Sequence, residues 1–336
     1  MRKALFIGGT GTISGAITAL ASRSGFELTL LNRGHNKDIP AGVRQITADI
    51  NDEAAVAKLL ENESFDIVAD FIVFTTKQLE RDIRLFTGKT RQYIVISSAS
   101  AYQSPLNTPF VNESTPLRNP YWQYSRDKIA IEDRVIKEYR DKAFPATIIR
   151  PSHTYCEKSV PVCLHGSKGS WQVVKRIMDD KPVIIPGDGL TWWTLTYNTD
   201  FAKAFVGIMG NSHALGEVFQ ITSDECLTWN MIHEIIAGAL GKKLRPVHIS
   251  ADMLCRVKPE WEGSLLGDKS LSIIFDNTKI KRFVPGFVCS VNADEGIRRA
   301  LDYVLSHPEC QIPDPEFDQV CDKLITAYEN FGAVAN

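Results

Sequence analysis

A tyrosine and a lysine four residues apart could carry proton-transfer chemistry in this chain. Tyr124 and Lys128 fall inside the helical stretch 121–139, where this spacing puts both side chains on one helix face. A nearby cation favours the phenolate and lowers the tyrosine pKa, so the phenol could take or give an alcohol proton near neutral pH. The same spacing also occurs in ordinary surface pairs, so the motif needs support from the rest of the chain.

A run of hydroxyl side chains gives part of that support. The apolar stretch 94–96 reads as a strand and ends in Ser97, Ser98 and Ser100. In a parallel sheet, the carboxyl end of a strand opens on the ligand crevice. A serine there could hydrogen-bond the reacting oxygen of a substrate, although such residues also cap strand ends.

A glycine-rich turn near the start of the chain predicts a dinucleotide site. Residues 6–15 read Phe-Ile-Gly-Gly-Thr-Gly-Thr-Ile-Ser-Gly, between an apolar run and a helical pattern. In that context main-chain N–H groups and a helix N-terminus can meet a pyrophosphate, whereas the alternative is an ordinary tight turn. Ser14 stands where a third glycine is usual. The residues expected to contact the cofactor are Gly8, Thr10, Gly11, Thr12 and Ile13.

The end of the second predicted strand bears on the choice between NAD and NADP. Asn32 and Arg33 stand there, in place of the acid that would hold the ribose hydroxyls of NAD. Arg33 could pair with a 2′-phosphate or stack on adenine, which favours NADP, unless it is a solvated surface arginine. Asp49 and Ile50 are placed to meet the adenine edge, unless Asp49 caps the helix that opens at Asp52.

The pattern of elements indicates a scaffold that could position these residues. Apolar runs predict strands at 4–7, 28–31, 67–74, 93–96 and 146–149, and helical stretches such as 52–60 and 77–86 lie between them. This alternation predicts an α/β fold with a Rossmann-type, doubly wound parallel sheet.

The second half of the chain predicts a smaller α+β C-terminal lobe that binds substrate. Helical patterns recur there around 232–240, 297–304 and 317–325. We expect residues 1–153, with 190–215 returning, to form the NAD(P)-binding domain, and residues 154–189 and 216–336 to form the substrate lobe.

Composition argues against a nucleic-acid-binding protein and against a membrane protein. The net charge is −2, with 44% hydrophobic and 23% charged residues, which gives no strong field for polyanions and makes nucleic acid an unexpected partner. The seven cysteines are scattered without a CxxC pair, and no 18-residue apolar run is present, so we expect a cytoplasmic protein without a membrane segment.

One loop collects potential metal ligands. His153, Cys156, Cys163 and His165 lie close together in the sequence, but their spacing is not that of a recognised zinc site. We therefore expect no metal and interpret the loop as a substrate cover.

Together these motifs resemble the extended short-chain dehydrogenase/reductases, and more narrowly their NAD-dependent epimerase/dehydratase family. The resemblance covers nearly the whole chain. The segments that carry it are the glycine turn 8–15, the strand end 97–102, the segment 113–128, Arg150-Pro151 and the stretch 186–200.

The resemblance implies a mechanism and residue roles. Tyr124 would be the catalytic acid/base, Lys128 its partner and a ligand of the nicotinamide ribose, and Ser98 the partner of the substrate hydroxyl. The implied reaction is hydride transfer between NAD(P) and a secondary alcohol of a sugar or nucleotide sugar, by an epimerase or oxidoreductase. A reductase of another small carbonyl compound is the alternative. The family also implies a homodimer that pairs the helices at 77–86 and 121–139.

Departures from the family pattern bear on the substrate. Ala99 and Ser100 follow Ser98 where dehydratases carry an acidic pair, so dehydratase activity is not expected. Trp193 stands near the position of a diphosphate-binding arginine, and His153 replaces an asparagine, which weakens the case for a nucleotide sugar. Ser100, His153 and Trp193 are candidate substrate contacts, although Trp193 could instead pack between the lobes.

A non-catalytic interpretation stays open as well. Some atypical members of the superfamily bind RNA or regulate, and Leu-Asn-Arg-Gly at 31–34 is similar to plastid stem-loop RNA-binding proteins. The acidic balance and the presence of Ser98, Tyr124 and Lys128 favour an enzyme.

Overall fold

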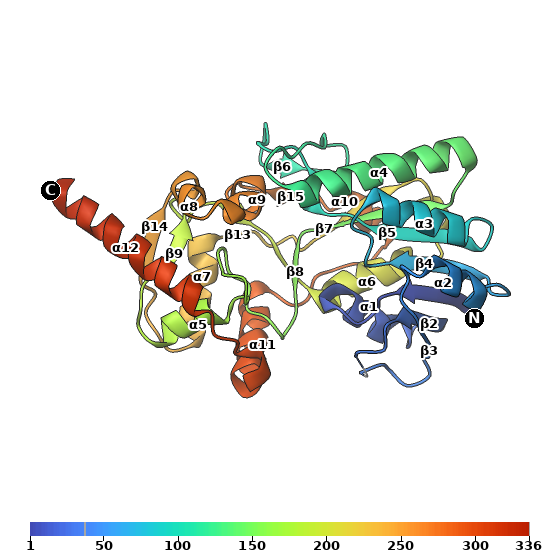
Figure 1. The fold of residues 1–336 in the computed structure, drawn as a ribbon, viewed down its shortest axis with the longest axis horizontal. Coiled ribbons are helices and arrows are strands. Elements are labelled where there is room, and N and C mark those ends of the chain that lie inside the picture. The colour runs from blue at the N-terminus through green and yellow to red at the C-terminus, as the bar shows by residue number, and fades with distance from the viewer. Residues whose placement is uncertain (37, 336) are drawn as a thin grey trace.

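The computed structural model describes residues 1–36 and 38–335 and is built around one parallel sheet (Figure 1). Its seven strands lie in the order β12-β7-β5-β4-β1-β2-β3, and each neighbouring pair is parallel. This confirms the Rossmann-type α/β fold. The strands are β1 (Arg2–Ile7), β2 (Phe26–Asn32), β3 (Arg44–Thr47), β4 (Phe65–Asp70), β5 (Thr90–Ile96), β7 (Ala146–Pro151) and β12 (Val218–Ile221).

Helices cover both faces of this sheet, which explains why its central strands are apolar along their whole length. One face carries α1 (Thr12–Ala21), α6 (Asn198–Ile208) and α10 (Thr278–Phe283), with Ile17, Phe201 and Ile280 in a shared core. The other face carries α2 (Glu53–Leu59), α3 (Thr76–Phe86) and α4 (Gln123–Lys142), with Val56, Leu79 and Ile131 in a second core.

The strand order reverses between β1 and β4, which is where such sheets bind ligands at their carboxyl edge. The strand predicted at 67–74 ends earlier, at Asp70. The Asp70 carboxylate accepts the Ile72 N–H at 2.6 Å, and this local bond turns the chain out of the sheet. Residues 71–75 therefore form a loop at the edge of the crevice.

A second lobe with its own core lies beside the carboxyl edge of the sheet, on the left in Figure 1. It is smaller and mixes helices with two-stranded sheets, as expected from the sequence. Its helices are α5 (Trp171–Met178), α7 (Trp229–Ala239), α8 (Ala251–Val257), α9 (Glu262–Ser264), α11 (Ala293–Ser306) and α12 (Pro315–Ala335).

Short strand pairs stabilise this lobe and connect it to the sheet. The parallel pairs are β9 (Val183–Pro186) with β14 (Pro246–Ile249), β8 (His153–Tyr155) with β11 (Leu195–Tyr197), and β6 (Phe110–Val111) with β15 (Ile274–Phe275). The antiparallel pair is β10 (Trp192–Trp193) with β13 (Leu227–Thr228).

The chain crosses between the two parts more often than the expected division allows. β12 lies within 216–336, yet it pairs with β7 at the edge of the large sheet, where the Gly216 N–H is bonded to the Ala146 carbonyl. β10 lies within 190–215, yet it pairs with β13 of the second lobe. Residues 37 and 336 of the expected ranges lie outside the described residues.

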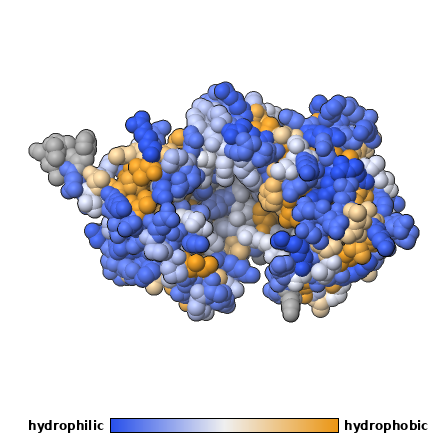
Figure 2. Space-filling model, in the orientation of Figure 1, coloured by the Kyte–Doolittle hydropathy of each residue, from blue (hydrophilic) through white to orange (hydrophobic). Residues whose placement is uncertain are grey.

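Figure 2 shows that the visible face is hollowed between the sheet and the second lobe. Among the helices of the described residues, none is both long enough and apolar enough to span a membrane.

Candidate active site

The glycine turn forms one wall of a cavity of about 460 Å³ at the carboxyl ends of β1, β2 and β4. A cavity of this size lies within the range of small-ligand pockets. Seven of the residues expected to bind the cofactor line it, namely Gly8, Thr10, Gly11, Asn32, Arg33, Asp49 and Ile50.

The backbone of the turn is suited to a close approach by a phosphate. Gly8 and Gly9 have φ angles of +98° and +92°, in the region that favours glycine. A Cβ on Gly9 would come within 2.8 Å of the Leu30 side chain. Positions 8 and 9 therefore favour glycine, and the turn presents its backbone at the N-terminus of α1.

Ser14 and Thr18 hold this turn from inside α1. The Ser14 hydroxyl accepts the Gly11 N–H at 2.9 Å, and the Thr18 hydroxyl donates to the Gly9 carbonyl at 2.8 Å. Ser14 thus has a structural role at the position where a third glycine is usual.

Two cofactor residues expected at the start of α1 do not line this cavity. The Thr12 carbonyl accepts the Asn198 amide at 3.0 Å, and Thr12 lines a separate groove on the other side of the turn. Ile13 packs against the apolar core beneath the sheet. The roles of Thr12 and Ile13 as cofactor contacts stay predictions, since α1 turns both positions away from this cavity.

The structure excludes one of the two interpretations of Asp49, that of a helix cap. Asp52 caps α2, since its own carboxylate accepts the Ala55 N–H at 3.1 Å. Asp49 accepts the Asn51 N–H at 2.9 Å and stays on the cavity wall. The cap is therefore Asp52, and Asp49 remains available to a ligand.

Other walls of this cavity were not found from the sequence. Phe71, Ile72, Phe74 and Gln78 line it from the loop after β4 and the start of α3. The strand expected at 67–74 covered most of this loop, so the pattern did not indicate that these side chains face the crevice.

A second cavity of about 300 Å³ gathers the proposed catalytic residues. Ser98 and Ser100 come from the end of β5, Tyr124 from the first turn of α4, and His153 from β8. Trp122, His165, Asp268 and Lys269 complete its polar and aromatic lining. Neither Asp268 nor Lys269 could be found from the sequence, because only the tertiary fold brings them near Tyr124.

Lys128 lies between the two cavities. Its ammonium is 4.8 Å from the centre of the Phe74 ring, which lines the first cavity, and 5.7 Å from the centre of the Tyr124 ring, which lines the second. It donates to the main-chain carbonyls of Val73 at 2.6 Å and Ile96 at 2.7 Å. Burial lowers the pKa of Lys128 to about 8.

The electrostatics of Tyr124 differ from the sequence-based expectation. Burial raises the pKa of the phenol, the neighbouring Ser98 hydroxyl lowers it in part, and the Asp268 carboxylate raises it further. The Lys128 ammonium, which donates to two carbonyl oxygens, does not offset this rise. A neutral phenol is therefore the favoured form near neutral pH.

The serine hydroxyls form a short chain beside Tyr124. Ser98 and Ser100 share a hydrogen bond of 2.9 Å, and Ser125 donates to Ser100 at 2.8 Å. The Ser98 main-chain conformation is extended, and its hydroxyl also accepts the Ser100 N–H. This network orients Ser98 toward the cavity that Tyr124 lines.

His153 and Trp193 have different positions relative to the cavity. His153 lines it, whereas Trp193 is 2% exposed and packs in the core of the second lobe against Trp229, with ring centres 5.2 Å apart. The Trp193 indole donates to Nδ1 of His153 at 3.1 Å. Trp193 thus packs in the core of the second lobe, as one of its two predicted interpretations had it, and the substrate contact stays a prediction.

The protonation state of His153 follows from this contact. Burial lowers its pKa to about 3, so the ring is neutral. Since Nδ1 accepts the Trp193 N–H, the proton of the neutral ring is assigned to Nε2.

A buried ion pair fixes α4 against the sheet. The Arg150 guanidinium donates to Glu132 at 2.9 and 2.6 Å, and Ser97 donates to the same carboxylate. Glu132 lies one turn after Lys128 on α4, so the pair helps to set the register that places Tyr124 and Lys128.

The loop with potential metal ligands does not converge on a metal site. Cys163 is buried beside His233 of α7, at 3.5 Å from Nε2, whereas His165 lines the second cavity. Within residues 1–36 and 38–335, no group of three or more His, Cys, Asp or Glu side chains is placed to hold a metal ion.

Comparison with known families identifies the domain. Residues 84–222 match the model of the NAD dependent epimerase/dehydratase family. The chain carries a domain of this family. The match includes Ser98, Tyr124 and Lys128, and it confirms the family that the sequence motifs indicated.

The curated proteins that this chain is similar to are named for different activities. The chain is 24% identical over 296 residues to a 2′-dehydrokanamycin reductase from Streptomyces kanamyceticus, across 85% of this chain and 80% of the relative. It is 26% identical over 254 residues to the chloroplast stem-loop binding protein of 41 kDa b from Arabidopsis thaliana, across 71% and 64%. It is 29% identical over 161 residues to a UDP-glucose 4-epimerase from Lactobacillus helveticus, across 42% and 48%.

Solved structures share the fold. A dTDP-glucose 4,6-dehydratase from Bacillus anthracis in complex with NAD has a TM-score of 0.73 at 16% identity, across 92% of this chain and 98% of that one. The UDP-glucose 4-epimerase of Thermus thermophilus in complex with NAD has a TM-score of 0.68 at 19% identity, across 90% and 98%.

Proposed function

We propose that this protein is an NAD(P)-dependent oxidoreductase or epimerase that acts at a secondary alcohol or ketone of a sugar, with Tyr124 as the acid/base. The observation that carries the proposal is the position of the Lys128 ammonium. It lies between the Phe74 ring of the cavity beneath the glycine turn and the Tyr124 ring of the second cavity. The two cavities are adjacent at this point, as a cofactor and a substrate that exchange a hydride require.

The first cavity fits the adenosine and phosphate part of a dinucleotide. The positive φ angles of Gly8 and Gly9 and the start of α1 at Thr12 provide the backbone that a pyrophosphate needs. A nicotinamide cofactor bound here would supply the hydride chemistry. Asp49 and Arg33 stand on the wall where its adenosine would lie.

The protein's own residues would orient the substrate and move one proton. The Tyr124 phenol donates its proton to the carbonyl oxygen in reduction, and the phenolate accepts it back in oxidation. Ser98 hydrogen-bonds the same oxygen and fixes its position. The Lys128 ammonium has one donor left after its two bonds to carbonyls, which suits a ribose hydroxyl.

The substrate is best assigned as a sugar without a nucleotide. Trp193 and Trp229 are buried and stacked near the place where the family resemblance puts a diphosphate-binding arginine. The relative named as a 2′-dehydrokanamycin reductase supports reduction of a ketone. The pair Ala99 and Ser100 after Ser98 argues against a dehydratase.

The cofactor preference is proposed to be NADP. β2 ends at Asn32, whose amide is held by Gln45 at 2.7 Å, and Arg33 is the next residue on the cavity wall. A guanidinium without an adjacent acid at this position matches a 2′-phosphate better than two ribose hydroxyls.

A stem-loop binding role is the second candidate, because one relative carries that name. The net charge of −2 argues against it. A homodimer through α3 and α4 also stays a prediction, which light scattering of the purified protein would test.

Turnover assays with a panel of substrates test the proposal. The purified protein is incubated with NADPH or NADH and with keto-sugars, and separately with NADP or NAD and UDP-, GDP- or dTDP-sugars, while NMR follows the products. Reduction of a free keto-sugar, with little turnover of any nucleotide sugar, is expected. Salt-sensitive RNA binding without turnover of any carbonyl compound or alcohol would contradict the proposal.

A further inference from the structure

A third cavity, of about 380 Å³, continues the substrate crevice into the second lobe. His165 is on the wall of both this cavity and the one that holds Tyr124. Ser264 lines the third cavity, and Asp268 one helical turn later lines the second. One loop and one helical stretch therefore run along both cavities, which places the third next to the proposed reaction centre.

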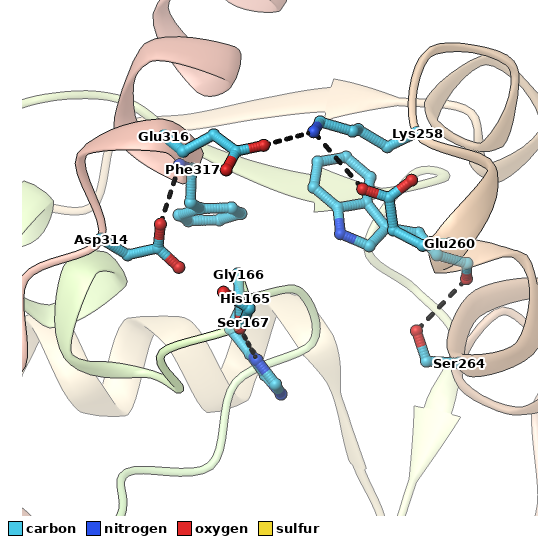
Figure 3. Close-up of a pocket in the computed structure, with 10 residues that line it drawn as sticks. His165, Gly166, Ser167, Lys258, Glu260, Ser264, Asp314, Glu316 and Phe317 are labelled. Carbon is cyan, nitrogen blue, oxygen red and sulfur yellow. Dashed lines mark hydrogen bonds and ion pairs between the residues drawn. The ribbon is translucent and has the colours of Figure 1, made fainter.

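The walls of this cavity are preformed (Figure 3). The Asp314 carboxylate accepts the N–H groups of Phe317 and Lys168, both at 3.1 Å, which fixes the loop at 165–168 against the start of α12. A Cβ on Gly166 would come within 2.2 Å of this carboxylate, so only glycine allows the loop to lie this close.

Aromatic side chains form the apolar part of the cavity. Trp261 and Phe317 pack edge to face with ring centres 6.1 Å apart, and both line the cavity. The C–H face of a sugar ring packs favourably on aromatic surface of this kind. The aromatic pair thus offers a contact for a second sugar ring of the substrate, next to the sugar ring that reacts.

The charged groups around the cavity are mainly acidic. Glu316 and Glu260 lie 2.8 and 3.3 Å from the single ammonium of Lys258, so that cation is already shared by two carboxylates. Figure 3 shows these three side chains on one rim, opposite His165. Asp268 adds a further carboxylate toward Tyr124, with no hydrogen-bond or ion-pair partner in the described part of the chain.

Lys269 is a positive group that offsets part of this negative charge. It lines the second cavity beside Asp268, so that cavity carries one charge of each sign, whereas the third cavity carries an excess of negative charge. A diphosphate would be repelled from the third cavity, and a cation would be attracted to it.

We propose that this third cavity is a subsite for a protonated amino group on a second ring of the substrate, with Glu260 and Glu316 as its charge partners. The inference rests on the proposed function for the identity of the reacting ring. It assigns the substrate class as an amino-substituted disaccharide or a larger glycoside. Glu260 and Glu316 would determine specificity and take no part in the hydride or proton transfer.

Calorimetric titration of the full-length protein at mildly acid pH tests this subsite without requiring turnover. The probes are the disaccharide of two glucosamine units, its diacetylated form, and cellobiose, which share one backbone and differ in charge. The diamine is expected to bind about five- to tenfold more tightly than either neutral disaccharide. The double variant Glu260→Gln/Glu316→Gln should lose this preference, since both carboxylates are exposed and their replacement spares the fold.

The matched control is Glu53→Gln, which removes a carboxylate from an exposed ion pair with Arg84 in the other lobe and should leave all three affinities unchanged. Equal binding of charged and neutral disaccharides, no binding of the diamine, or an unchanged preference in the double variant would each overturn the subsite. Failure of the proposed reaction would show separately, as binding of the diamine without turnover of any sugar.

Discussion

The ammonium of Lys128 is hydrogen-bonded to the main-chain carbonyl of Val73, at 2.6 Å, and to that of Ile96, at 2.7 Å. Ile96 is the last residue of β5, and Val73 lies in the loop after the neighbouring strand β4, so Lys128 ties both segments to α4. The bonds also hold the charge 5.7 Å from the centre of the Tyr124 ring. Lys128 is therefore a positioning group at the junction of the two cavities.

Replacing Lys128 with Met should remove a pH dependence of stability. Burial lowers the pKa of Lys128 to about 8, from its usual value of 10.5. Between these two values the unfolded chain binds a proton that the folded chain does not, so the free energy of unfolding rises with pH. This rise should amount to at most about 3 kcal/mol, and it should be absent in the variant.

Urea unfolding of both proteins at several pH values between about 7 and 10 measures this difference. The comparison isolates Lys128, because all other titrating groups are common to the two proteins. Parallel pH profiles for the wild type and the variant would show that the lysine is not buried as the structure places it.

Breaking the ion pair between Glu132 and Arg150 should strongly lower the free energy of unfolding. Both side chains are buried, with exposures of 4% and 0% for Arg150 and Glu132. Glu132→Gln leaves the guanidinium without its charge partner and should cost about 3–5 kcal/mol of unfolding free energy. Asp141→Asn, which breaks the exposed pair with Lys137, should cost less than about 1 kcal/mol. Chemical denaturation that gave similar costs for both variants would contradict this account.

Arg33→Ser should change the cofactor preference. Loss of one charge-assisted contact with a 2′-phosphate is expected to raise the KM for NADPH by about tenfold to a hundredfold. The KM for NADH should change by less than about threefold, since NADH lacks that phosphate. Steady-state kinetics with both cofactors measure the ratio. An equal rise for both would mean that Arg33 contacts a part that the two cofactors share.

The sequence was sufficient to predict the fold and most of the residues that line the first cavity, because those features are local. The glycine turn, the strand before it and the helix after it are contiguous, so Gly8, Gly11 and Arg33 could be placed together. The second cavity depended on family resemblance for Ser98 and Tyr124, which lie on separate elements.

What the sequence could not predict depends on long-range packing. Asp268 reaches Tyr124 only because the second lobe folds over the carboxyl edge of the sheet. For Trp193, a substrate contact and packing between the lobes were both open, because its partner Trp229, which places it in a core, lies far along the chain. The bonds of Lys128 to Val73 and Ile96 follow from the early end of β4, which the apolar pattern of residues 71–74 concealed.

In the proposed reaction, the Tyr124 phenol moves the proton that accompanies hydride transfer. Since burial raises the pKa of this phenol, it is protonated at neutral pH and is ready to donate in reduction. Reduction should therefore be nearly independent of pH around neutrality, whereas the oxidation rate should rise with pH as phenolate forms.

The Tyr124→Phe variant tests this role of the phenol. Its turnover and its affinity for the cofactor are measured beside those of the wild type. The substitution removes only the hydroxyl, so the fold and the dissociation constant of the cofactor should stay the same. Turnover of the keto-sugar should fall by about a hundredfold to ten-thousandfold. Turnover within a few-fold of the wild type, with cofactor binding intact, would contradict the assignment of Tyr124 as the acid/base.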